Sequence, residues 1–248
     1  MTASAASLLF APGERPRADA IVALARDQAG FAVSFDPATR DDPASAGQGG
    51  WLELLANGLT FDLAGLGPGQ PAPLPPRAHR YGLPADFDPG LYEAITVRPG
   101  PHLASGATML PVVRSLAWLA ARLASLPGVK AVVWHPARCL SSPEQFADAV
   151  LRWVEGGVFP AFSLAALAPM PDGGLHSEGL ALFTGQELRL EPEVAPDRAA
   201  AGKIGLRLLH WLVEHGALTE PERLSDPDGA PLRLEPSANQ RFVRVWRG

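Results

Sequence analysis

The stretch Ala131–Val154, AVVWHPARCLSSPEQFADAVLRWV, carries the clearest local signals in the chain. Its first four residues form a short continuous apolar run, as expected for a strand covered on both faces, and this run ends at His135. Ser142 is placed to cap a helix, with Pro143 at the first helical position and Gln145 completing a capping box. Apolar residues then recur at helical spacing. The stretch therefore predicts a strand, a polar turn and a helix with one face in a core.

The composition is that of a globular protein that folds without disulfides. Apolar residues make up 47% of the 248 residues and charged residues 19%, with a mean hydropathy of +0.05. A net charge of −5 and a pI near 5.7 argue against nonspecific binding to nucleic acid or to an anionic membrane, since both need a basic field. The single cysteine, Cys139, excludes an intrachain disulfide and fits a reducing cytosol.

We expect a cytoplasmic protein with no contact to membranes. The N-terminal apolar run has no basic residues before it and is broken at Pro12 and Gly13, so it does not read as a signal peptide. The most apolar long segment, 106–126, contains Arg114 and Arg122, which favours a buried amphipathic helix over a membrane span.

Strand and helix patterns mix along the chain without strict alternation, which predicts an α+β fold with mixed, partly antiparallel sheets and packed helices. Asn57-Gly58 between two apolar runs predicts a hairpin. The proline-rich segment 67–77 predicts an extended connector between two halves of the fold. We place these halves at 1–98 and 99–248, packed as one globule, and favour a tandem of ferredoxin-like units from the order of elements. The expected strands are 7–11, 31–35, 51–55, 59–66, 91–98, 131–134, 161–167, 179–183, 187–190 and 242–246, and the expected helices are 15–29, 107–126, 143–156 and 197–215.

The last third of the chain resembles a bacterial domain of unknown function, the four-two-six-one type. The resemblance rests on HSEGLALFTGQELRLEP, in which the matching positions are Ser177, Gly179, Leu180, Phe183, Gly185 and Glu187, and on the long helix and the SDPDGAPLRL turn that follow. It implies a small α+β unit and assigns no catalytic residue.

No familiar catalytic or cofactor motif is present. The chain has no Walker motif, no Gly-x-Gly-x-x-Gly after a strand, no Gly-x-Ser-x-Gly elbow and no His-Glu-x-x-His helix, and we expect no cofactor. The most suggestive cluster is the loop with His135, Cys139, Ser141 and Ser142, because a helix N-terminus can lower the pKa of a thiol. A Cys/His nucleophilic pair is the catalytic interpretation. The alternative, which we favour, is a buried structural cysteine and a hydrogen-bonded histidine.

Three further groups of polar residues have a functional and a structural interpretation. His102, His176 and Glu178 could join His135 in a metal site, although their spacing matches no recognised pattern, and we favour solvent-facing side chains. The second group is Asp36, Asp41 and Asp42. These aspartates could bind a cation, but the glycine and glutamate of a calcium-binding loop are missing, so we favour a role in turn formation. The third group is Arg241, Arg244 and Arg247. These arginines would suit a nucleic-acid-binding surface, but in a strand their side chains alternate between the two faces, so we interpret them as protection of an edge strand.

Two functions from different classes are consistent with these observations. The first is a noncatalytic accessory, regulatory or immunity-like module that acts through contacts with another protein or with itself, because catalytic motifs are absent and the tryptophans could anchor an interface. The second is a small-molecule-binding protein or hydrolase that uses the loop from His135 to Ser142.

Overall fold

The computed structural model describes residues 4–27, 30–39, 50–194 and 197–248. Its contacts divide the chain into two units, Met1–Gly157 (unit 1) and Val158–Gly248 (unit 2). The boundary predicted after residue 98 is thereby moved. Strand β7 (Ala131–Trp134) pairs with β1 (Ala6–Phe10), and β1 also pairs with β6 (Glu93–Pro99). Residues on both sides of position 98 thus share one sheet.

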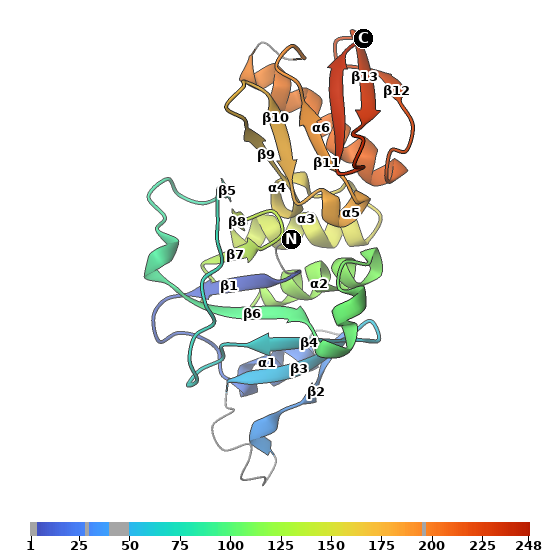
Figure 1. Ribbon diagram of the computed structural model, residues 1–248. Helices are drawn as coiled ribbons and strands as arrows, with labels where there is room; N and C mark the ends of the chain where they lie inside the picture. The colour runs from blue at the N-terminus through green and yellow to red at the C-terminus, as the bar shows by residue number, and fades with distance from the viewer. Residues whose placement is uncertain (1–3, 28–29, 40–49, 195–196) are drawn as a thin grey trace. The chain divides into compact units, whose positions relative to one another are not determined.

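Unit 1 is built on an eight-stranded sheet in the order β2-β3-β4-β6-β1-β7-β8-β5 (Figure 1). Neighbouring strands are antiparallel except β5 and β8, which run parallel. The remaining strands are β2 (Phe31–Phe35), β3 (Trp51–Ala56), β4 (Leu59–Ala64), β5 (His79–Tyr81) and β8 (Cys139–Ser141). The helices are α1 (Ala18–Asp27), α2 (Leu110–Leu123) and α3 (Pro143–Val154), with 3-10 turns η1 (Pro37–Thr39), η3 (Pro89–Leu91) and η4 (Pro101–Gly106).

The two faces of this sheet are covered differently. Helix α2 packs against β1, β4 and β6 on one face. On the other face, Leu74, Leu83 and Phe87 from the chain between β4 and β6 pack on a cluster of sheet residues, Leu9, Ala94, Ala131, Val133 and Leu140. Ala72 also forms a β-bridge to Ala94. The proline-rich segment 67–77 therefore covers the sheet of unit 1, and its interpretation as a connector between two halves was wrong.

Local signals account for two elements of unit 1. Asn57 and Gly58 have φ of 52° and 76°, the positive values that a two-residue turn between β3 and β4 requires. The Ser142 Oγ accepts a hydrogen bond from the Gln145 N–H at 3.3 Å, which confirms the predicted cap of α3. The prediction of a polar turn before that cap missed strand β8, which lies within the segment. Three residues are too few to show a strand period.

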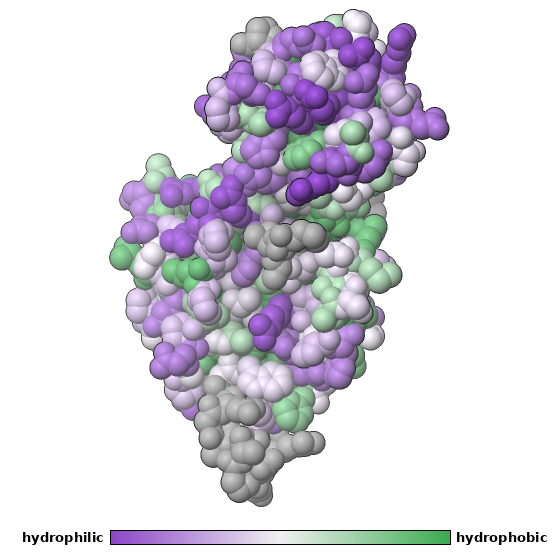
Figure 2. Space-filling model, in the orientation of Figure 1, coloured by the Kyte–Doolittle hydropathy of each residue, from purple (hydrophilic) through white to green (hydrophobic). Residues whose placement is uncertain are grey.

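Unit 2 contains a six-stranded sheet in the order β12-β13-β14-β11-β10-β9, in which only β11 and β14 are parallel neighbours. Its strands are β9 (Ala166–Pro169), β10 (Leu175–Glu178), β11 (Glu187–Leu190), β12 (Glu222–Ser225), β13 (Pro231–Pro236) and β14 (Phe242–Arg247). Helix α6 (Arg198–His215) packs on β11, and the short helices α4 (Ala161–Leu164) and α5 (Ala181–Thr184) contact α6. In Figure 1 these strands lie in front of α6, and Figure 2 shows mostly hydrophilic side chains over them.

Three predictions for unit 2 need correction. The strand expected at 161–167 is α4 followed by β9, and in place of the strand expected at 179–183 the helix α5 lies between β10 and β11. Strand β14 is no edge strand, because it lies between β13 and β11. Its arginines therefore do not protect an edge.

The α+β class with mixed sheets is confirmed, since both sheets combine parallel and antiparallel neighbours with packed helices. No ferredoxin-like unit is confirmed. Strands β1 and β2, which flank α1, are separated by three other strands in the sheet. Within the described ranges, no helix combines the length and apolar character needed to cross a membrane.

Candidate functional site

His135 binds a serine from a distant strand. Its Nε2 lies 2.8 Å from the Oγ of Ser7, and this Oγ lies 2.6 Å from the Oγ1 of Thr96. Ser7 is fully buried, and burial lowers the pKa of His135 from 6.5 to about 4. The imidazole is thus neutral near pH 7. A serine and a histidine in contact resemble a nucleophile and its base, but a hydroxyl with no exposed surface cannot reach a substrate.

Cys139 and Ser141 lie on the opposite face of the sheet. Val133 pairs with Leu140, and both belong to the cluster beneath the proline-rich segment. Since side chains alternate along a strand, Cys139 and Ser141 point to the helix side, whereas His135 follows Val133 to the Ser7 side. Both residues are fully buried. The structure does not bring these side chains together with His135.

The candidate metal ligands are also dispersed. His102 lies in η4 of unit 1, whereas His176 and Glu178 lie on β10 of unit 2. The Nε2 of His176 is 3.5 Å from Glu178 Oε1, so these two form a pair. Among the residues that the structure describes, no group of three or more histidine, cysteine, aspartate or glutamate side chains could hold a metal ion.

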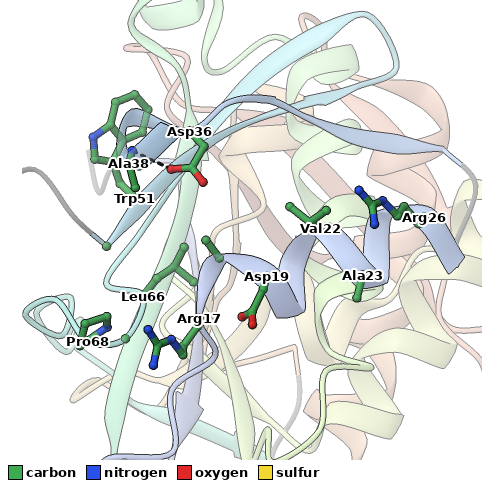
Figure 3. A pocket seen from close by; sticks show the side chains of 13 residues that line it. Arg17, Asp19, Val22, Ala23, Arg26, Asp36, Ala38, Trp51, Leu66 and Pro68 are labelled. Atoms are coloured by element: carbon green, nitrogen blue, oxygen red, sulfur yellow. Dashed lines mark hydrogen bonds between the residues drawn. The ribbon is translucent and has the colours of Figure 1, made fainter. Parts of the chain in front are cut away.

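A hollow in unit 1 has a volume of about 750 Å³ (Figure 3). Asp19 and Arg26 line it from α1 and Arg17 from the residue before that helix, and Asp36 lies across from them. Asp36 Oδ1 accepts from the N–H of Ala38 at 2.9 Å, in keeping with the predicted role in a turn. The other two aspartates of that prediction, Asp41 and Asp42, lie outside the described residues. With two cations and two anions on its wall, the hollow indicates no ligand charge.

Several of the residues that carry the resemblance to the four-two-six-one domain share a hydrogen-bond network in unit 2. Glu187 accepts from the Ser177 hydroxyl and from the N–H groups of Gly179, Leu180 and Ala181, at 2.9 to 3.2 Å for the three amides. Burial raises the pKa of Glu187 against the lowering effect of these bonds. This carboxylate holds the start of α5, so the signature is explained by structure and gives no catalytic group.

An apolar groove of about 360 Å³ runs between the edge strand β9 and α6. Its apolar wall is Phe162, Leu167, Pro169, Leu175 and Leu206, and Phe162 is 43% exposed. Two cations, Arg198 and Lys203, flank it on α6. The sequence analysis missed this groove because it interpreted 161–167 as one strand and did not predict α4, which carries Phe162.

Comparison of the chain with protein-family models, curated proteins and solved structures finds no match. The resemblance of the last third to the four-two-six-one domain therefore stays a prediction.

Proposed function

We propose that the protein is a noncatalytic accessory or regulatory module, of the kind that includes immunity proteins, and that it acts through contacts with another protein. The observation that carries this proposal is the groove beside α6. Exposed aromatic and aliphatic side chains that line one concave surface are typical of protein interfaces. The alternative function, a small-molecule-binding protein or hydrolase using the His135–Ser142 loop, lacks such support because Cys139 and Ser141 are fully buried.

The partner that fits the groove is an amphipathic helix with acidic flanks. Strand β9 is four residues long and ends at Pro169, and short edges that contain proline resist the addition of another strand. A helix in the groove is the remaining common recognition mode for an apolar cleft of this kind. Arg198 and Lys203 beside the apolar wall favour carboxylates on the flanks of that helix.

Two designed helical peptides test this proposal by fluorescence anisotropy with the full chain. Both carry leucine at helical spacing, one with glutamate flanks and one with lysine flanks. We expect the acidic peptide to bind, the basic peptide to bind at least tenfold more weakly, and Phe162→Ser and Lys203→Gln to weaken the acidic peptide by about tenfold.

Two matched variants control for nonspecific effects. Val158→Ser removes a side chain that is 70% exposed outside the groove, and Lys130→Gln removes the same charge from unit 1. Equal binding to all variants, or none to the wild type, would contradict the proposal. If sedimentation shows a dimer and Phe162→Ser dissociates it, the occupant of the groove is a second copy of this chain and not another protein.

A further inference from the structure

Three basic side chains form a row across the uncovered face of the unit 2 sheet. His176 on β10 is paired in register with Arg189 on β11, and Arg189 is paired with Arg244 on β14. Residues paired in this way have Cβ atoms about 5 Å apart, and like charges in such positions repel each other. Carboxylates border the row at both ends, because Glu178 Oε1 lies 3.5 Å from His176 Nε2 and Glu235 on β13 is paired in register with Arg244.

Glu191 links the two arginines of the row. Its Oε1 accepts from Arg189 Nε at 3.0 Å and from Arg244 Nε at 2.6 Å. Burial alone would raise the pKa of Glu191, but the bonds from the two arginines outweigh burial and lower it. Both guanidinium planes are thereby fixed through their Nε edges. Arg244 also lies over the ring of Trp246, 4.4 Å from its centroid.

This row lines a pocket of about 530 Å³, and the described residues of its wall include hydrogen-bond donors and no carboxylate. The lining residues are Met170, His176, Arg189, Ser237, Phe242 and Arg244. His176 contributes ring surface to this wall, since its Nδ1 is buried and its Nε2 lies 3.5 Å from Glu178 Oε1. Glu191 occupies the Nε edges and Asp172 bonds Arg189 Nη2 at 2.5 Å, whereas no described residue accepts from the Nη atoms of Arg244. Donors held in place and lacking acceptors are the requirement for oxyanion recognition.

We infer that this pocket is a binding site for a small organic anion that has a carboxylate or phosphate head and an apolar body. The head would accept hydrogen bonds from the Nη groups of Arg244 and Arg189. The body would lie against Met170 and Phe242, which form the apolar part of the wall. This site is separate from the groove beside α6, because the two share no lining residue.

Calorimetric titration of the full chain tests the site with four probes: inorganic phosphate, phenyl phosphate, benzoate and neutral benzamide. We expect phenyl phosphate or benzoate to bind more tightly than inorganic phosphate, and benzamide not to bind. Binding should weaken as ionic strength rises, because a charged head is recognised at a partly exposed site. Equal binding of benzamide would overturn the electrostatic basis, and equal binding of inorganic phosphate would overturn the role of the apolar body.

Two pairs of variants localise the binding. Arg244→Gln should weaken the anionic probe at least tenfold, whereas Arg233→Gln, which removes the same charge from the neighbouring strand β13 outside the pocket, should leave it within about twofold. Met170→Glu should abolish binding by placing a carboxylate in the pocket, and Met170→Gln should retain it. Failure of the wild type to bind any anionic probe at millimolar concentration, or equal losses in the matched variants, would overturn the inference.

Discussion

The buried imidazole of His135 makes the stability of unit 1 depend on pH in a defined window. Its pKa is lowered from 6.5 to about 4, with burial as the cause. Above pH 6.5 the side chain is neutral in the folded and unfolded states, and its full contribution to stability is present. As the pH falls below 6.5, His135 is protonated in the unfolded chain but stays neutral in the folded chain. Stability is therefore lost until the pH reaches about 4.

The magnitude follows from the two pKa values. Each tenfold change in a protonation constant is worth about 1.4 kcal/mol, so complete titration would cost about 3 kcal/mol. By pH 4.5 the loss should be about 2.5 kcal/mol. A change of this size is a large fraction of the stability of a typical domain.

Denaturant titrations of the wild type and of His135→Gln at pH 7, 6, 5 and 4.5 measure this loss, with tryptophan fluorescence as the signal. Glutamine is uncharged at every pH and retains groups that can bond the Ser7 hydroxyl. The free energy of unfolding of the wild type should fall relative to that of the variant by about 2.5 kcal/mol between pH 7 and 4.5. The remaining histidines and the carboxylates are common to both proteins, so their titration cancels.

Ser7→Ala separates burial from hydrogen bonding. It removes the hydroxyl at 2.8 Å from Nε2 and leaves the imidazole in place. Because burial lowers the pKa, the pH dependence should persist in this variant, although its stability at pH 7 should fall by about 1 kcal/mol. Parallel curves for the wild type and His135→Gln would refute the reasoning, because they would mean that His135 titrates normally in the folded protein.

Three other predictions concern packing. Cys139 is fully buried, so a thiol reagent should label no cysteine in the native protein and one after denaturation; rapid native labelling would reject its burial. Gly65→Ala should lower the free energy of unfolding by well above the roughly 1 kcal/mol expected for Gly58→Ala. Both glycines have positive φ, but only at Gly65 would a Cβ lie 2.7 Å from backbone atoms of two other segments. Thermal unfolding of the two variants measures the difference. Glu187→Ala should destabilise the protein by about 2 kcal/mol or more in denaturant titrations because four donors lose their acceptor, whereas the same change at the exposed Glu220 should have little effect.

Elements with strong local signals could be predicted from the sequence. Helix α3 was placed correctly because the cap, the proline and the apolar spacing lie within a dozen residues. The hairpin at Asn57-Gly58 was also predicted, since its turn chemistry is local. In contrast, α5 was read as a strand because the carboxylate that binds the amides at its start belongs to Glu187, on the following strand β11, and this contact leaves no helical pattern in the sequence.

The candidate sites could be predicted less well, because they depend on pairing between distant segments. The partner of His135 is Ser7, 128 residues away, and no local pattern connects them. Similarly, Arg244 was singled out from the alternation of β14, but its position beside Arg189 requires the parallel pairing of β11 and β14. Chain segments so far apart in sequence can pair in many registers, and only the whole sheet selects one.

Strand β11 shows how the charges of unit 2 are divided between structure and binding. Glu187, Arg189 and Glu191 follow each other at every second position, which places them on one face of the sheet. The first carboxylate is occupied by the amides of α5 and the last by the Nε groups of two arginines. Both anions of this strand are therefore engaged within the fold, and the groups that remain directed at the pocket are donors. An anionic ligand would find these donors in the pocket, whereas a cationic ligand would find no carboxylate among the described residues that line it.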